Sequence, residues 1–261
     1  MAAGMTSAAS EISSPVGVVA GGGAMPFAVA DSLAARGQLG RAMRLFREEG
    51  CRDLIFIGTL VRPALSEIRF DVTTLRLLGN VIRAFRGGDD HLLSGVGRIL
   101  EQGGFRMVGI KDVAPDLLMP EGCISRAWPN DNSKADIERG RAVLTALGPF
   151  DIGQAAVVID GHVVAIEDIE GTDALLARVA RLREEGRIRA ATGRGVLVKV
   201  PKSGQDLRFD LPTIGPRTLE GVARAGLAGI AVVAGNTIAA EPQAMISLAD
   251  AKYLFVIGLT A

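Results

Sequence analysis

Short apolar runs alternate with amphipathic segments along this chain, and this alternation restricts the fold more than any other feature. Val16–Ala20, Leu54–Ile57 and Val196–Val200 are each followed directly by glycine or proline. Runs of this length predict buried strands of a parallel sheet. Because aromatic residues make up only 4% of the chain, we expect a core of Ala, Val, Leu and Ile, as in α/β proteins rather than in aromatic-rich β-sandwiches.

The first half of the chain predicts a small, doubly wound, Rossmann-like domain over residues 15–128. We expect a disordered tail at residues 1–14, and then a strand at Val16–Ala20 that leads through Gly21–Gly23 into a helix. The elements expected in this domain are helices over 27–36, 39–49, 75–86 and 91–102, with further strands over 54–57 and 105–110.

The second half predicts a mixed α/β domain over residues 134–261, after a linker at 129–133 in an aperiodic segment rich in Pro and Asn. Two apolar runs alternate across Asp160-Gly161, which is a strong signal for a two-residue hairpin. Ser133 is expected to cap the first helix of this domain. The elements expected here are helices over 134–147, 172–183, 216–225 and 241–251, and strands over 155–159, 163–166, 196–200, 230–234 and 254–257.

Charge balance and the scarcity of soft metal ligands exclude several classes of function. The 29 basic and 29 acidic residues cancel, so the chain lacks the positive field of a general nucleic-acid binder. With Cys51 and Cys123 outside any CxxC pattern and only His91 and His162 as imidazoles, zinc has too few ligands, and we expect inert thiols in a reducing cytosol. No apolar run reaches the ~20 residues of a membrane span and no signal-peptide pattern is present, so we expect a cytoplasmic protein.

Three motifs have both a structural and a functional interpretation. Gly21–Gly23 offers backbone N–H groups to a phosphate, but glycine equally allows a tight turn. Asp89 and Asp90 are expected first to cap a helix and to stabilise its dipole. In Glu170–Asp173, Thr172 can cap a helix, while the hydroxyl and two carboxylates also suit a polar ligand, and the two roles are compatible.

A charge-dense loop of the second domain contains Asp206 and Asp210, four residues apart, among three cations, Lys199, Lys202 and Arg208. This arrangement suits coordination of Mg²⁺ by the carboxylates while the cations neutralise phosphate oxygens. A solvated loop of ion pairs is the alternative. Two prolines restrict the backbone of the loop, which favours a functional role.

Several of these motifs occur in an order shared with one known family. They are Val16–Pro26 (VGVVAGGGAMP), Arg62-Pro63, Gly88–Asp90, Pro115–Gly122 (PDLLMPEG), Asp151–Gln154 (DIGQ), Glu170–Asp173 (EGTD) and Lys199–Gly215. Together they span nearly the whole chain beyond Ser14 and resemble the LpxI family of UDP-2,3-diacylglucosamine pyrophosphatases.

The resemblance implies a two-domain, homodimeric enzyme of lipid A biosynthesis that holds its ligand between the domains and requires Mg²⁺. Water would attack the α-phosphorus of UDP-2,3-diacylglucosamine, giving UMP and 2,3-diacylglucosamine 1-phosphate (lipid X). Because this substrate is diacylated, we expect a transient contact with the surface of the inner membrane. Two other hypotheses stay open: a non-catalytic protein that binds a nucleotide sugar or a partner, and hydrolysis of a different nucleotide sugar.

Carried over motif by motif, the resemblance implies that Asp210 is the essential acidic residue and a metal ligand. Asp206 is our candidate for a second catalytic carboxylate. The candidate substrate-binding residues are Gly21, Gly22, Gly23, Arg62, Asp89, Asp90, Gln154, Glu170, Gly171, Thr172, Asp173, Lys199, Lys202, Gln205, Arg208 and Thr213.

One part of the chain departs from the pattern of the family. A loop, a strand and a second loop separate the first two helices in the family, whereas this chain passes from Arg36 almost directly into the helix that begins at Leu39. Thr59 also stands where the family more often has a larger polar residue. Because a lost strand removes a loop at the ligand-binding end of a parallel sheet, we expect the first domain to be altered there.

Overall fold

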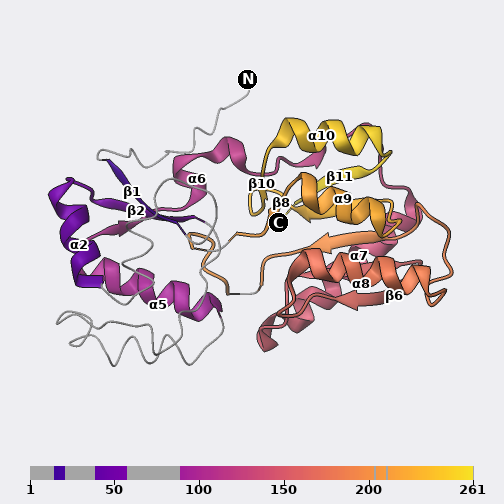
Figure 1. Cartoon of the computed structure of the whole chain (residues 1–261), viewed down its shortest axis with the longest axis horizontal. Coiled ribbons are helices and arrows are strands. Elements are labelled where there is room, and N and C mark those ends of the chain that lie inside the picture. Colours follow the sequence, from indigo (N-terminus) through magenta and orange to yellow (C-terminus); the bar gives the residue numbers. More distant parts are fainter. Residues whose placement is uncertain (1–14, 21–38, 58–88, 203, 210, 261) are drawn as a thin grey trace, which may run out of the picture. The chain divides into compact units, whose positions relative to one another are not determined.

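The computed structural model of the protein describes residues 15–20, 39–57, 89–202, 204–209 and 211–260 (Figure 1). They divide into two compact units. The first unit contains the described residues up to Pro115 together with residues 206–209, and the second unit contains the rest. The predicted α/β class is confirmed, but the boundary falls before Asp116, not at the predicted linker. The tail at 1–14 and the helices expected over 27–36 and 75–86 lie outside the described residues.

The described sheet of the first unit has three parallel strands in the order β1-β2-β3. Its buried core contains Phe46, Leu54, Ile99 and Phe105. The rings of Phe46 and Phe105 pack edge to face, with their centroids 6.1 Å apart. The strand expected over 105–110 is only two residues long, because the chain turns into a short helix at Ile110. The elements of this unit are β1 (Val16–Ala20), α2 (Leu39–Glu48), β2 (Asp53–Ile57), α5 (Asp89–Gln102), β3 (Arg106–Met107) and α6 (Ile110–Val113).

The second unit is built on a six-stranded sheet in the order β4-β11-β9-β7-β5-β6. Strands β7, β9 and β11 are parallel, while β4, β5 and β6 each run antiparallel to a neighbour. The predicted hairpin is confirmed, with Asp160 and Gly161 both at positive φ as its turn requires. The strands are β4 (Gly122–Cys123), β5 (Ala155–Ile159), β6 (His162–Ile166), β7 (Val196–Lys199), β9 (Gly229–Val233) and β11 (Phe255–Leu259).

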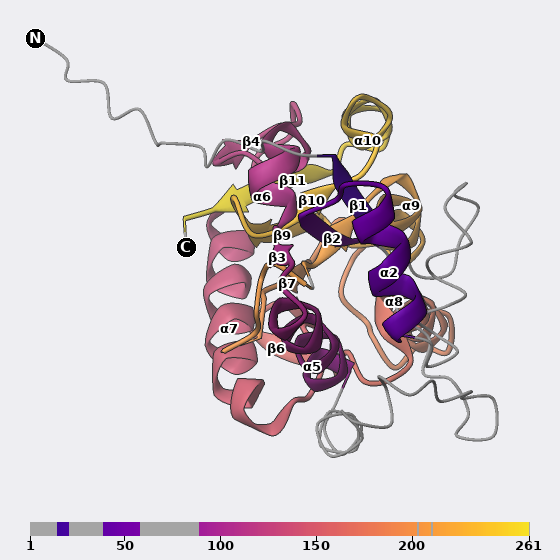
Figure 2. The ribbon, with the colours of Figure 1, turned by 90° about the vertical axis from the view of Figure 1, so that its left-hand side faces the viewer.

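Helices cover both faces of this sheet, which explains why its strands are apolar throughout. Ile137 of α7 packs with Val198 on one face, and Leu175 of α8 packs with Leu197 on the other. The helix α7 lies across the sheet from α8 and α9 (Figure 2). The helices are α7 (Asp131–Leu147), α8 (Gly171–Glu184), α9 (Pro216–Arg224) and α10 (Pro242–Ala251), with the 3-10 turns η2 (Pro115–Leu117) and η3 (Gly148–Phe150).

The segment predicted as a linker is part of the second unit. Cys123 of β4 pairs with Ile257 of β11, so the chain has already joined the sheet before residue 129. The helix α7 is capped by Asn130, whose side-chain oxygen accepts from the backbone N–H of Ser133 at 2.9 Å. The predicted cap at Ser133 is therefore wrong by one helical turn, because Asn130 uses its side chain for the same purpose.

The charge-dense loop after β7 passes from the second unit into the first. Phe209 is 6% exposed and belongs to the core of the first unit, where its ring lies 5.5 Å from that of Phe56. Gly97 of α5 makes room for it, since a Cβ there would lie 2.4 Å from the Phe209 ring. The chain then returns to the second unit through β8 (Thr213–Ile214), which pairs with β10 (Ile238–Ala239).

Candidate active site

One edge of the second unit collects polar residues from four segments. Ala155 at the start of β5 pairs with Lys199 at the end of β7, and Ala156 pairs with Ile166 at the end of β6. This register places Gln154, Glu167 and Lys199 at the carboxyl edge of the parallel strands. Ligands of α/β sheets bind at this edge.

A chain of partly buried hydrogen bonds connects these segments. The Glu167 side chain accepts from the Gln154 backbone N–H (2.9 Å) and from the Thr172 hydroxyl (2.6 Å). The Lys199 ammonium donates to the Thr172 hydroxyl oxygen (2.9 Å) and the Thr213 carbonyl oxygen (3.4 Å). We call Gln154, Glu167, Thr172, Lys199 and Thr213 the Lys199 network.

Chemistry fixes the direction of each bond in this chain. A carboxylate only accepts and an ammonium only donates, so the hydroxyl of Thr172 must donate to Glu167 and accept from Lys199. Glu167 and Lys199 are each 6% exposed. The two described acceptors, the Thr172 hydroxyl and the Thr213 carbonyl, thus orient a buried ammonium, and a cation oriented in this way can stabilise a developing negative charge.

A glycine brings the two sides of the site together. Gly153 has a positive φ of 24°, and a Cβ there would lie 2.1 Å from the Glu167 carbonyl oxygen. Only glycine permits this approach, which sets the Gln154 N–H against the carboxylate of Glu167. The side-chain oxygen of Gln154 is also buried and has no hydrogen-bond partner among the described residues. It is a polar atom that a ligand can satisfy.

Only one side chain of the Glu170–Asp173 motif joins this network. Thr172 lies inside α8 and bonds to Glu167 rather than capping the helix, because Glu170 occupies the cap position. Glu170 forms an ion pair with Arg178, and Asp173 pairs with the exposed Arg217 at 2.9 Å. Gly171 has a φ of 78° and allows the chain to turn into the helix. The motif is thus partly structural and partly a component of the site.

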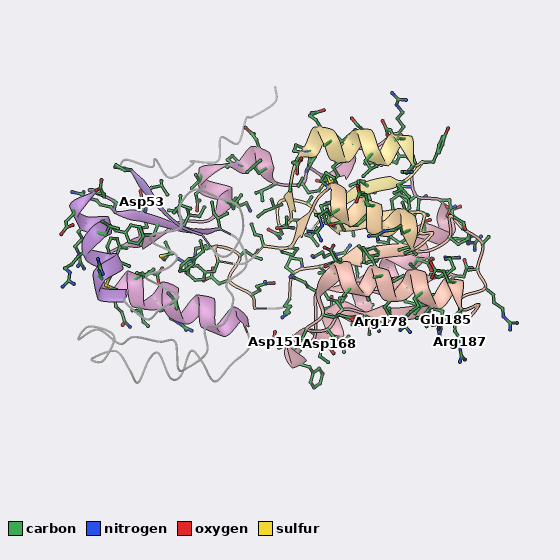
Figure 3. The ribbon with its side chains drawn as sticks, viewed as in Figure 1. Asp53, Asp151, Asp168, Arg178, Glu185 and Arg187 are labelled. Atoms are coloured by element: carbon green, nitrogen blue, oxygen red, sulfur yellow. The ribbon has the colours of Figure 1, made fainter. Side chains whose placement is uncertain are left out.

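Lys202 and Gln205 organise the loop that follows β7. The Lys202 ammonium donates to the Asp151 carboxylate at 2.6 Å, and the Lys202 backbone N–H donates to the Gln205 side chain at 2.9 Å. Figure 3 labels Asp151 and Asp168, which lie on two loops at the same end of the second unit. The predicted neighbourhood of Lys199, Lys202, Gln154 and Thr172 is therefore present within one unit.

Asp206 and Arg208 lie in the first unit and bond to each other. Both Asp206 oxygens accept from the Arg208 guanidinium, at 3.0 and 2.8 Å, and Arg208 also donates to Glu101 at 2.9 Å. The hydrogen bond from Arg208 holds the pKa of Asp206 below its ordinary value, and the same contact raises the pKa of Arg208. Asp206 therefore has an ion-pairing role within the first unit, and its catalytic role stays a prediction.

Several predicted residues are not tested by the structure. Asp89 and Asp90 are the first two residues of α5, as expected from their capping interpretation. The predicted site residues outside the described part of the chain are Gly21, Gly22, Gly23, Arg62 and Asp210.

Among the described residues, no three His, Cys, Asp or Glu side chains cluster as metal ligands. The described helices include none that is long and apolar enough to cross a membrane.

The sequence interpretation missed Glu167 and Asp151 as site residues. Glu167 directly follows a predicted strand, at the end where polar residues of an α/β sheet meet ligands, and this position was the available signal. Asp151 belongs to the same motif as Gln154 and was passed over. Glu167 is directly followed by Asp168, so this pair of carboxylates was a second available signal.

Comparisons with known proteins cover both units. The family model of the LpxI N-terminal domain matches residues 34–117, and that of the LpxI C-terminal domain matches residues 120–257. The protein from Caulobacter vibrioides named UDP-2,3-diacylglucosamine pyrophosphatase LpxI is 39% identical over 271 residues, covering 94% of this chain and 97% of the relative. The Lys199 network lies entirely within the C-terminal match.

Proposed function

Because the chain belongs to the LpxI family, we propose that it hydrolyses UDP-2,3-diacylglucosamine to UMP and 2,3-diacylglucosamine 1-phosphate in lipid A biosynthesis. The observation that carries this proposal is the identity to the Caulobacter relative across both units, joined to a buried ammonium at the ligand edge of the second unit. The alternative, binding without turnover, is favoured by the departure from the family's pattern before Leu39.

The reaction transfers a phosphoryl group to water. The water oxygen forms a bond to the α-phosphorus while the bond from that phosphorus to the bridging oxygen breaks. The electron pair leaves with the sugar 1-phosphate, and the water gives up a proton. Negative charge grows on the phosphate oxygens, so fixed hydrogen-bond donors near them lower the barrier.

In this proposal, Lys199 donates to a phosphate oxygen, and Thr172 and Glu167 position it. The Thr172 hydroxyl sets the direction of the ammonium, and the Glu167 carboxylate sets the direction of the hydroxyl. Lys202, held by Asp151, adds a second cation on the same loop. The buried amide oxygen of Gln154 is available to a hydroxyl or imide N–H of the substrate.

Asp210 is proposed as the residue that accepts the proton of the water or holds a metal ion. In the sequence it stands between Phe209, buried in the core of the first unit, and Leu211, which belongs to the second unit. Its two neighbours are therefore fixed by different units. The resemblance to the LpxI family, which implies an essential acidic residue at this position, supports its role in the reaction.

Mg²⁺ is proposed as the cofactor. Mg²⁺ is commonly bound through one or two carboxylates, waters and substrate phosphates rather than by an all-protein cage. The described carboxylates near the network, Glu167 and Asp151, already accept hydrogen bonds from protein groups. The fit of the metal therefore depends on Asp210 and the diphosphate of the substrate.

A peripheral contact with the inner membrane is proposed for this cytoplasmic protein. Phe150, Ile152 and Ile169, which we call the apolar rim, are 72%, 39% and 99% exposed on the two loops joined by the approach of Gly153 to Glu167. The rim therefore borders the Lys199 network. Exposed apolar side chains beside a site for a diacylated substrate favour contact with acyl chains.

We also propose a homodimer, which sedimentation of the purified protein tests.

Hydrolysis of the purified substrate tests the proposed function. Full-length protein incubated with UDP-2,3-diacylglucosamine in detergent micelles with Mg²⁺ is expected to release UMP. In ¹⁸O-labelled water, the label is expected in UMP, because water attacks the α-phosphorus. Substrate binding without UMP release would favour the non-catalytic alternative, and label in the sugar phosphate would place the attack at the β-phosphorus.

A further inference from the structure

The second unit contains a pocket of about 580 Å³ at the edge opposite the Lys199 network. Ala228 and Leu254, which line it, directly precede β9 and β11, so it lies at the amino ends of strands whose carboxyl ends face the active site. Its volume is within the range of pockets that hold small ligands. The site proposed for hydrolysis does not include any residue of this pocket.

Two aromatic side chains flank this pocket, although aromatic residues are rare in the chain. Trp128 is the only tryptophan and Tyr253 the only tyrosine, and they are 69% and 87% exposed. Tyr253 has a φ of 55°, a conformation that a bulky residue adopts only at an energetic cost. Exposed aromatic faces at a pocket are suited to stack on a planar ligand group.

The charged groups of the pocket are all positive. Arg224 and Lys252 line it, both are exposed, and neither forms an ion pair with a described residue. The lining contains no Asp or Glu. The neighbouring Arg126 differs, because it forms an ion pair with Asp250 and does not line the pocket. The pocket therefore selects an anion.

We propose that this pocket binds a nucleoside phosphate, with the base stacked on Trp128 or Tyr253 and the phosphate bound by Arg224 and Lys252. Only a ligand with both a planar group and a negative charge can contact the aromatic side chains and the cations of this pocket. Inorganic phosphate and most lipid head groups lack the planar group.

The sole tryptophan makes a direct test possible. Trp128 fluorescence of the full-length protein, excited at long wavelength where nucleotides hardly absorb, is followed during titration with AMP, adenosine and inorganic phosphate. AMP avoids the uridine specificity expected of the active site. Saturable quenching by AMP is expected, with adenosine and phosphate each binding about tenfold more weakly or worse.

Substitutions in the lining test whether AMP binds in this pocket. The double substitution Arg224→Ala with Lys252→Ala is expected to weaken AMP binding about tenfold or more, and Tyr253→Ala about fivefold. The matched control Arg126→Ala is expected to leave it unchanged. In equilibrium dialysis, the wild type is expected to bind one AMP per chain in this pocket, and Trp128→Ala combined with Tyr253→Ala is expected to weaken that binding about tenfold or more.

Four results would overturn the proposal. The first is AMP quenching that persists when both Arg224 and Lys252 are replaced, and the second is inorganic phosphate that binds as tightly as AMP. The third is AMP affinity that is unchanged when both Trp128 and Tyr253 are replaced by Ala. The fourth is burial of Trp128 by vesicles or by self-association, with no response to AMP. None of these measurements uses the hydrolytic activity, so failure here is distinguishable from failure of the proposed function.

Discussion

Lys199 in the second unit and Arg208 in the first lie nine residues apart in the sequence, but their side chains have different surroundings. The Lys199 ammonium is buried and donates to a hydroxyl and a carbonyl oxygen. Arg208 is 42% exposed and donates to the carboxylates of Asp206 and Glu101. The described acceptors of Lys199 hold its ammonium at the ligand edge of the sheet of the second unit, whereas the two carboxylates bonded to Arg208 neutralise its guanidinium inside the first unit. The comparison therefore gives Lys199 a role in the reaction and Arg208 a role in holding the charge-dense loop in the first unit.

The two carboxylates of the charge-dense loop give the strongest test of this comparison. Asp210→Ala is expected to lower the rate of UMP release about a thousandfold or more, because a proton acceptor or metal ligand is lost. The matched substitution Asp206→Ala is expected to cost less than about tenfold, since that carboxylate already bonds to Arg208. Both rates are measured with saturating substrate in micelles, and equal losses in the two variants would break the distinction.

Removal of divalent metal tests whether the lysine side chains of the second unit are sufficient for catalysis without Mg²⁺. We expect activity to fall about a thousandfold in excess EDTA and to return with Mg²⁺, since fixed ammonium groups alone do not match a metal ion on a diphosphate. Far-ultraviolet circular dichroism under the same conditions controls for unfolding. Full activity after exhaustive chelation would show that Lys199 and Lys202 replace the metal.

The Lys199 network is tested at the residue that links its charges. Lys199→Met is expected to lower kcat/KM a few hundredfold, which is about the effect of losing one preorganised donor. Thr172→Val leaves Glu167 and Lys199 without their common partner and is expected to lower kcat up to about a hundredfold. Thr172→Ser keeps the hydroxyl and is expected to restore most of kcat. If serine rescues no better than valine, Thr172 acts by packing and not by positioning Lys199.

Much of this arrangement was accessible from the sequence, and the second unit more than the first. The apolar runs of β5, β7 and β9 and the Asp160-Gly161 turn each have a local cause, so their positions were predicted within one or two residues. The short strands β4, β8 and β10 have no such pattern, since pairs of residues form them only against an existing sheet edge or each other. Local sequence does not carry that information.

The residue types of the site were predictable from the sequence, but the contacts that connect these residues were not. Lys199, Thr172 and Gln154 were all expected at a ligand, and one unit does bring them together. Nothing local showed that Phe209 would enter the core of the first unit, because burial of a single aromatic depends on tertiary packing against Phe56 and Gly97. Glu167 was missed for a related reason: its two partners lie 13 and five residues away.

The apolar rim belongs to the second unit alone, so we expect this unit to make the contact with the membrane. Replacing Phe150 and Ile169 by Ser is expected to reduce binding to vesicles about tenfold, since two apolar side chains no longer leave water. UMP release from micellar substrate is expected to stay near its wild-type rate. Binding by apolar groups is also expected to persist in high salt.

The matched control for the rim is Trp128→Ser, which removes an equally exposed aromatic at the opposite edge of the same unit. Vesicle binding should be unchanged in that variant. Complete release of the wild-type protein by moderate salt would show that attachment is electrostatic, and an equal loss in Trp128→Ser would place the contact elsewhere.

The smallest effect concerns the stability that the first unit gains from its exposed ion pair. The pKa of Asp206 is lowered in the folded state by the hydrogen bond from Arg208. This carboxylate therefore stabilises the fold at pH values above its unfolded pKa of about 4. The contribution is lost as the pH falls through the lower, folded pKa. Because the pair is partly exposed and screened by solvent, we expect only about 0.5 kcal/mol.

Urea unfolding of wild type and Asp206→Asn, followed by a probe in the first unit, measures this contribution. The variant is expected to be less stable at neutral pH and to converge with wild type in acid, and added salt should narrow the difference at neutral pH. Asp116→Asn is the control, because Asp116 is exposed in the second unit and forms no ion pair with a described residue. A difference between wild type and Asp206→Asn that does not depend on pH would mean that Asp206 acts through the backbone hydrogen bond it accepts from Arg208, a bond that asparagine can also make. The ion pair would then contribute nothing measurable, and the contrast between the two units would rest on the Lys199 network alone.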